Sequence, residues 1–181
     1  MSELIAELFL IAPADAAPEP VIAALEAMDE PAAALLLPRG SRTDRDYEML
    51  VAKVTPVAQA AGTAVLIEAP PSVAKRLGVD GVHVDGDLEA VRSAVSALKP
   101  EMIVGAAESR TRHDAMQKGE LDIDYILFGP LSGAISDGAR EMAQWWAQTM
   151  QIPSVLADPE ATLDDHDALG CEFIGLGLKL P

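Results

Sequence analysis

Residues 66–87 read LIEAPPSVAKRLGVDGVHVDGD, and this stretch predicts the unit from which the fold is built. A strand rich in β-branched residues, Ala64–Ile67, comes first, and a segment with helical spacing follows at Pro71–Leu77. Gly78 stands where that helix should stop, and a second strand follows at Gly81–Val84. Two strands joined by a helix within so few residues are typical of a parallel βαβ unit.

The same alternation continues toward both ends of the chain. Eight short apolar runs are expected to be strands: Leu4–Ala12, Ala33–Leu37, Ala64–Ile67, Gly81–Val84, Met102–Ala106, Tyr125–Phe128, Ser154–Ala157 and Phe173–Leu178. Seven segments between them are expected to be helices: Pro18–Met28, Thr43–Ala61, Pro71–Leu77, Leu88–Leu98, Arg110–Lys118, Gly138–Met150 and Leu163–Leu169. Ser72 and Asp87 are the expected N-caps of two of these helices.

Eight strands that alternate with helices favour an α/β fold of the (βα)8 TIM-barrel type, in a single domain over residues 1–181. An open doubly wound sheet usually has fewer strands and often a glycine-rich first turn, which Ala12-Pro13-Ala14-Asp15 is not. The chain is short for a barrel, and the missing part is the helix after the eighth strand. The apolar flank left there predicts a homodimer.

The charge balance excludes several classes of partner. The chain has 13 Lys and Arg against 29 Asp and Glu, a formal net charge of −16, which opposes binding to nucleic acid or to an anionic membrane. Cys171 is the lone cysteine, so no internal disulfide can form. The first residues have neither the basic region of a signal peptide nor an apolar run long enough for a membrane anchor. We therefore expect a cytoplasmic protein.

Several motifs along the chain are similar to those of the thiamine phosphate synthase and thiazole tautomerase superfamily. Gly78-Val79-Asp80-Gly81-Val82-His83 resembles its Gly-Ala-Asp-Gly-Val-His strand, and residues 124–130, DYILFGP, resemble its Asp-Tyr-Ile-Gly-Phe-Gly-Pro strand. The likeness runs through residues 33–178 in register over six strands. The family fold is a (βα)8 barrel, in agreement with the strand count.

The resemblance implies an activity and a ligand class. The family joins an aminopyrimidine diphosphate to a thiazole phosphate and releases pyrophosphate with the help of Mg²⁺. A small-molecule ligand, either a thiamine precursor or a thiamine-like compound, is therefore the expected partner. Physically, such a site needs carboxylates for Mg²⁺, cations and hydroxyls for the diphosphate, and glycine-rich backbone for the second phosphate.

The metal-binding positions are only partly kept. The family's metal-binding Asp after the third strand falls at Ala69, which cannot bind a metal, and its Asn neighbour falls at Glu68. Glu68 is a candidate catalytic residue, with an ordinary solvated carboxylate as the alternative. Asp85 and Asp87 after the fourth strand are the candidate Mg²⁺ ligands, and Asp87 has a competing role as a helix N-cap.

The phosphate-binding positions are further reduced. The family's Ser after the fifth strand falls at Ala107, so Ser109 is the candidate hydroxyl there and, with Glu68, a candidate catalytic residue. Gly129 and Ser132 are candidate phosphate-binding residues after the sixth strand, where the family's Lys is missing. Arg39, after the second strand, is the best candidate anchor for a phosphate, with a salt bridge to a nearby acidic residue as the alternative.

Two further positions complete the predicted site. Asp158-Pro159-Glu160 replaces the family's phosphate-binding glycine turn after the seventh strand, and Pro159 has no N–H to donate. His83 is expected either inside the barrel or in the layer between the sheet and the helices, as a structural residue with its hydrogen bonds satisfied. The sequence thus predicts a divergent thiamine phosphate synthase-like protein with an acidic site. The alternatives are a non-catalytic binding or assembly barrel with an acidic cup, or another enzyme that pairs Glu68 with Asp87 or Asp158 for acid/base catalysis.

Overall fold

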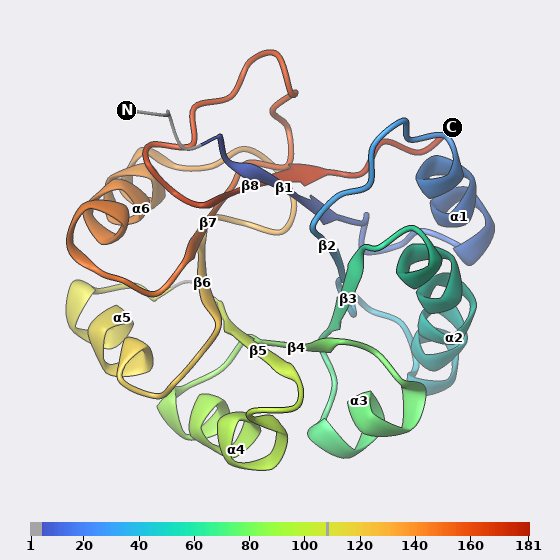
Figure 1. Cartoon of the computed structure of the whole chain (residues 1–181), viewed down its shortest axis with the longest axis horizontal. Coiled ribbons are helices and arrows are strands. Elements are labelled where there is room, and N and C mark those ends of the chain that lie inside the picture. The colour runs from blue at the N-terminus through green and yellow to red at the C-terminus, as the bar shows by residue number, and fades with distance from the viewer. Residues whose placement is uncertain (1–4, 108) are drawn as a thin grey trace.

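The computed structural model describes residues 5–107 and 109–181 and closes eight parallel strands into a barrel (Figure 1). The strands follow one another around the barrel in chain order, and β8 closes the ring against β1. Their bounds are β1 Glu7–Ile11, β2 Ala34–Leu37, β3 Ala64–Ile67, β4 Gly81–Val84, β5 Ile103–Ala106, β6 Tyr125–Phe128, β7 Ser154–Ala157 and β8 Phe173–Gly177. The predicted TIM-type barrel is confirmed, and Leu4 of the first predicted strand lies outside the described residues.

Six helices lie in the described part of the chain: α1 Pro18–Glu26, α2 Asp44–Ala60, α3 Pro71–Leu77, α4 Leu88–Leu98, α5 Arg112–Gly119 and α6 Asp137–Thr149. They form an outer layer that runs from α1 around to α6 (Figure 1). In the described part of the chain no helix follows β7 or β8, and a loop joins these two strands (Figure 1). No helix of the described residues is both long enough and apolar enough to cross a membrane.

The helix predicted over Leu163–Leu169 is wrong, because this segment is a loop. Its Asp residues favour local hydrogen bonds over a helix, and the Asp167 carboxylate accepts the backbone N–H of Leu169 at 2.9 Å. Leu169 itself has a φ of +52°, which a right-handed helix does not allow. Ser72 is also not an N-cap, since α3 begins one residue earlier, at Pro71. The barrel therefore lacks helices after both β7 and β8 among the described residues.

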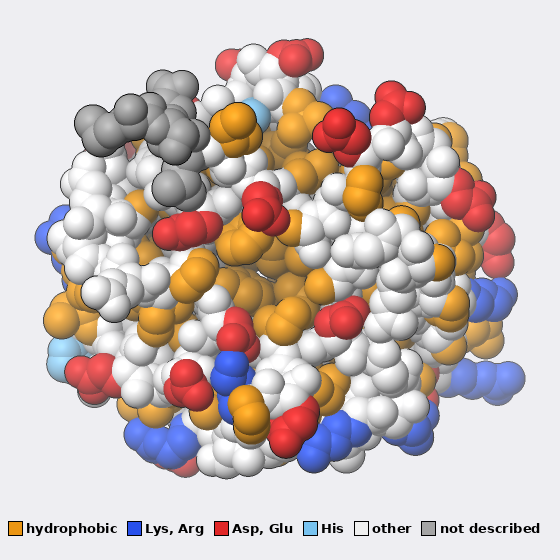
Figure 2. Space-filling view, viewed as in Figure 1, with side chains coloured by type: hydrophobic (Ala, Val, Ile, Leu, Met, Phe, Trp, Pro, Cys, Tyr) orange, Lys and Arg blue, Asp and Glu red, His pale blue; other side chains and the backbone are white. Residues whose placement is uncertain are grey.

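The two faces of the sheet form two hydrophobic clusters. Phe9, Ile11, Leu36, Leu66 and Leu127 are among the buried residues that fill the inside of the barrel. The larger cluster lies between the strands and the helices. In the space-filling view, hydrophobic side chains surround the barrel axis and acidic side chains lie around them, with most Lys and Arg near the periphery (Figure 2). The inward-facing residues that continue past the strand ends therefore define the mouth of the barrel.

Acidic residues also fix the strand starts. Asp80, Asp124 and Glu172 each stand directly before an even-numbered strand. Each side chain accepts the backbone N–H of a residue on the preceding odd-numbered strand, at distances of 2.7–2.8 Å. These carboxylates thus supply hydrogen-bond acceptors to backbone N–H groups at the amino-terminal end of the sheet. Three of the acidic residues are thus part of the barrel framework.

Candidate functional site

A cavity of about 270 Å³ opens at the carboxyl ends of β4, β5 and β6. Functional sites of TIM barrels lie at this end of the strands. The side chains and backbone that line it belong to His83, Asp85, Ala107, Arg110, Leu127, Gly129, Pro130 and Leu131. We call this the mouth cavity. It contains two of the predicted site residues, Asp85 and Gly129.

His83 lines the mouth cavity and is buried, and inside the barrel its ring contacts the buried side chain of Tyr125. His83 Nδ1 and the Tyr125 hydroxyl lie 2.8 Å apart. Gly105 makes this possible, because a Cβ at that position would lie 1.9 Å from the Tyr125 ring. Burial lowers the pKa of His83 to about 4, so the imidazole is neutral at pH 7. When Tyr125 donates to Nδ1, the His83 proton sits on Nε2.

His83 is therefore inside the barrel as predicted, but its hydrogen bonding is incomplete. Nε2 is buried and has no partner among the described residues. A buried ring nitrogen without a partner is costly, and a ligand in the mouth cavity can supply one. The sequence pattern placed His83 on a strand but gave no sign that the residue would line a cavity.

Glu68, at the end of β3, is half-buried and held by backbone on both sides. Its Oε2 accepts the N–H of Arg39 at 3.0 Å, and its own N–H donates to the Tyr47 hydroxyl at 2.9 Å. Burial is the main cause that raises the pKa of the Glu68 carboxyl, and the charge of Asp85 raises it further. A carboxyl group with a raised pKa beside a second carboxylate has the properties of an acid/base residue or a cation ligand.

Tyr47, which the sequence analysis did not single out, fixes this side of the mouth. It lies on α2 and is 1% exposed. Besides accepting from Glu68, its hydroxyl donates to the Leu37 carbonyl at 2.5 Å. A single hydroxyl thus joins the ends of β2 and β3.

Arg39 forms the salt bridge to a nearby acidic residue that the sequence analysis gave as the alternative to phosphate binding. Its Nη2 lies 2.5 Å from Asp44 Oδ1, and its guanidinium carbon lies 5.6 Å from the centre of the Tyr47 ring. Asp44 therefore competes with a phosphate for the charge of Arg39. Ser132 is exposed on the turn after β6, whereas Gly129 lines the mouth cavity with a φ of +114°.

The predicted Mg²⁺ ligands are only partly free. Asp85 is exposed at the mouth, but Asp87 is the N-cap of α4 and accepts the N–H of Ala90 at 2.9 Å. Ala69 offers no ligand atom. Among the described residues, no three His, Cys, Asp or Glu side chains are grouped to hold a metal ion. Asp85 and Asp87 can therefore supply only part of a shell, and Mg²⁺ would need further ligands from a bound phosphate.

Ser109 does not lie in the mouth cavity. It lines a neighbouring cavity of about 380 Å³, which also contacts Gly86, Asp87, Leu88, Arg110, Asp114, Gln117 and Lys118. We call this the flank cavity. Arg110 lines both cavities. Burial lowers the pKa of Lys118, and the charges of Asp114, Asp85 and Asp87 oppose that change.

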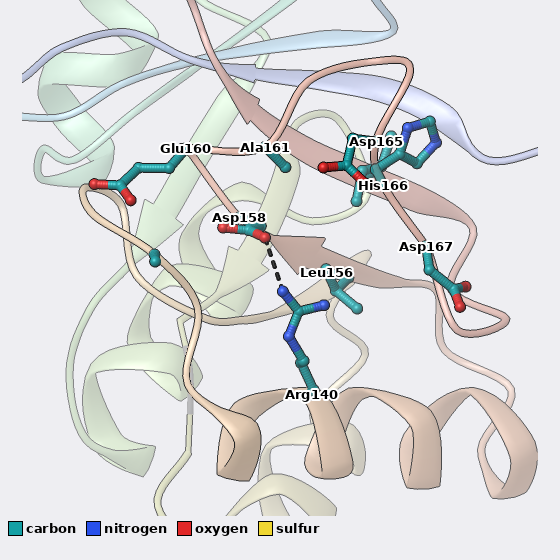
Figure 3. A pocket seen from close by; sticks show the side chains of 10 residues that line it. Arg140, Leu156, Asp158, Glu160, Ala161, Asp165, His166 and Asp167 are labelled. Atoms are coloured by element: carbon teal, nitrogen blue, oxygen red, sulfur yellow. Dashed lines mark hydrogen bonds and ion pairs between the residues drawn. The ribbon is translucent and has the colours of Figure 1, made fainter.

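Asp158 acts as a bridge between elements. One carboxylate oxygen accepts the N–H of Ile135 at 3.2 Å, and the other lies 3.0 Å from Arg140 Nη2 (Figure 3). These contacts join the end of β7 to α6 and the loop before it. A cavity of about 410 Å³ lies beside this ion pair, between α6 and the 160–167 loop (Figure 3). It occupies the side of the barrel where the predicted helix is missing.

Comparison with protein families gives one match over most of the chain. Residues 8–157 match the family model described as thiamine monophosphate synthase. A thiamine-phosphate synthase of Hyphomonas neptunium is 38% identical over 110 residues, 58% of this chain and 49% of that protein. One of Erythrobacter litoralis is 28% identical over 164 residues, 85% of this chain and 77% of that protein. The match to the first relative thus spans about half of that protein's length.

Solved structures confirm the fold. The thiamine phosphate pyrophosphorylase of Pyrococcus furiosus superposes with a TM-score of 0.74 at 19% identity, covering 94% of this chain and 85% of that one. An HpcH/HpaI aldolase of Desulfitobacterium hafniense superposes with a TM-score of 0.66 at 15% identity, covering 96% and 87%. At such identities the superpositions establish the barrel only.

Proposed function

Because the chain belongs to the thiamine monophosphate synthase family, we propose that it is a divergent synthase-like protein that takes a thiamine precursor or thiamine-like ligand at the mouth of its barrel. The observation that carries the proposal is the mouth cavity, whose lining includes the exposed Asp85 and the buried His83, a residue whose Nε2 has no partner among the described residues. A nitrogen heterocycle offers both donors and acceptors to such a pair.

The residues at the phosphate-binding positions fit the family reaction less well than the mouth cavity does. Arg39 is paired with Asp44, Ser132 is exposed, and Pro159 replaces a backbone donor. Mg²⁺ between Asp85, Asp87 and a bound diphosphate would neutralise the charge of the leaving group. In this proposal Glu68 acts as an acid or base at the mouth, and Ser109 contributes from the flank cavity through the loop it shares with Arg110.

A reaction assay tests the proposal. The purified protein is incubated with the aminopyrimidine diphosphate, the thiazole phosphate and Mg²⁺, and released pyrophosphate is measured. Turnover that falls at least tenfold in His83→Gln and Asp85→Asn supports a catalytic site at the mouth. The matched control is Lys75→Met, an exposed residue on α3. Turnover that neither mouth substitution reduces contradicts the assignment.

One observation favours a second function, binding without catalysis. The charge of Asp85 raises the pKa of Glu68, so the two carboxylates repel each other across the mouth. A cation such as the thiazolium ring of thiamine relieves that repulsion. No pyrophosphate release together with saturable thiamine binding by calorimetry, lost in Glu68→Gln, would identify an acidic cup of this kind.

The homodimer also remains a proposal. The outer face of β8 and β1 carries a cavity of about 240 Å³ lined mainly by apolar side chains, among them Leu8, Leu10, Leu176 and Leu178. Leu163 lines it and is 61% exposed. If a second copy covers this face, Leu163→Glu should convert a dimer into a monomer in light scattering. A monomeric parent protein contradicts the proposal.

A further inference from the structure

Lys118 is buried although it carries a charge. It lies on α5 three residues after Ala115, and these two are the buried residues of that helix. Only 7% of Lys118 is exposed. Its Nζ has one hydrogen bond among the described residues, to the Ala107 carbonyl at a long 3.4 Å. A buried ammonium group is costly unless it is well paired, and Nζ is only weakly paired among the described residues.

Ser109 is a second buried donor in the same place. The residue is 3% exposed, and its Oγ has no hydrogen-bond partner among the described residues. Both Ser109 and Lys118 line the flank cavity, whose volume of about 380 Å³ is sufficient for a small metabolite. Two buried donors that are short of acceptors among the described residues therefore line the same cavity.

We propose that the flank cavity binds the carboxylate group of a small metabolite, with the Lys118 ammonium and the Ser109 hydroxyl as its donors. Arg110 lies on the exposed rim and can reach the same group. A carboxylate oxygen accepts hydrogen bonds from both donor types, and a charged acceptor gives the stronger bond. The carboxylate of the ligand thus supplies hydrogen-bond acceptors for the Lys118 ammonium and the Ser109 hydroxyl.

The other charges of the cavity define the ligand class. Asp87 and Asp114 line it and are exposed, so the two cationic side chains are balanced by two anionic ones. This balance disfavours a phosphate dianion, because its second charge would face the carboxylates. A monocarboxylate fits, and an amino acid fits better, since its ammonium can turn toward Asp87 or Asp114.

The flank cavity differs from the mouth cavity, although Asp87 and Ser109, which also enter the function proposed above, line it. The flank cavity lies between the β4–α4 loop and α5, and it shares only Arg110 with the residues that line the mouth cavity. Its test needs no turnover, so the two proposals can fail separately.

The experiment is a titration of the ¹⁵N-labelled protein with acetate, glycine or inorganic phosphate, followed by NMR. We expect saturable shifts of the Ser109 and Lys118 amide signals with acetate and glycine, and at least tenfold weaker binding of phosphate. Lys118→Met should abolish binding, Ser109→Ala should weaken it about fivefold, in line with one lost hydrogen bond, and the exposed control Lys75→Met should change nothing.

The unliganded variants give an independent measurement. Ser109→Ala removes a buried hydroxyl without a partner among the described residues, and Lys118→Met removes a buried ammonium group with one long hydrogen bond. Each substitution should therefore raise the Tm or leave it unchanged. A Tm lowered by either would assign a structural role to the side chain and overturn the proposal. The same conclusion follows if acetate and glycine produce no saturable shift, if phosphate binds as tightly, or if Lys118→Met still binds. A Lys118→Met protein that fails to fold is the extreme case of a lowered Tm and likewise overturns the proposal.

Discussion

Tyr47→Phe removes one oxygen atom and, with it, two hydrogen bonds at the mouth of the barrel. The Leu37 carbonyl loses its donor at 2.5 Å, and the Glu68 N–H loses its acceptor at 2.9 Å. The phenyl ring keeps its place because Tyr47 is 1% exposed on the inner side of α2. The substitution therefore isolates the hydrogen bonds from the packing.

The expected loss follows from these two groups. A buried polar group left without a partner costs about 1–3 kcal/mol. The Leu37 carbonyl is deeply buried, whereas the Glu68 N–H is partly exposed and can recover a water molecule, so we expect a total of about 2–4 kcal/mol. For a chain of this length that corresponds to a fall in Tm of roughly 5–15 °C.

Urea unfolding followed by circular dichroism measures the loss. Tyr125→Phe is the matched control, because it removes the hydroxyl of the other buried tyrosine, which has one hydrogen bond among the described residues, to His83. We expect it to lose about half as much as Tyr47→Phe, or less. A Tyr47→Phe protein within about 0.5 kcal/mol of the parent, or less affected than Tyr125→Phe, would refute the bridging role of Tyr47.

Three further substitutions test the site. Glu68→Gln should stabilise the protein at pH 7 and lose this advantage as the pH falls below the ordinary carboxyl pKa, because the raised pKa of Glu68 means that the folded state binds the carboxyl proton more tightly. Urea unfolding at several pH values measures the difference in stability from the parent protein. A difference that grows toward low pH contradicts the prediction. Gly105→Ala should destabilise by about 2–5 kcal/mol, since its Cβ would lie 1.9 Å from the Tyr125 ring, and adding Tyr125→Leu should recover much of the loss in urea unfolding. Mg²⁺ should raise the Tm only when pyrophosphate is present, and Asp85→Asn should abolish the effect; an equal effect in that variant excludes Asp85 as a ligand.

The strands could be predicted because their signals are local. A short β-branched run, such as Ala64–Ile67 or Tyr125–Phe128, ends at a turn and is followed by a segment with helical spacing, and both ranges match the structure. The segment Leu163–Leu169 misled because its apolar ends have helical spacing. The aspartates between them bind nearby backbone instead, and this competition is not visible in the apolar pattern.

The site was predicted less fully than the fold. Asp87 as an N-cap and the alternative pairing of Arg39 follow from partners within a few residues, which sequence spacing can reveal. The roles of Tyr47 and Lys118 depend on strands and loops distant in the chain, so spacing alone could not show them. A signal did exist for Lys118, because it stands three residues from Ala115 and hence on the same face of the helix.

The net charge of −16 has more than one physical origin. Asp80, Asp124 and Glu172 each bind a backbone N–H of the preceding strand, so they are used as strand-end acceptors irrespective of any ligand. Asp158 is neutralised by Arg140. After these are set aside, Glu68 and Asp85 are the carboxylates whose mutual repulsion is felt at the mouth. The acidity that bears on ligand choice is thus local, and a ligand that brings positive charge to these two groups gains most.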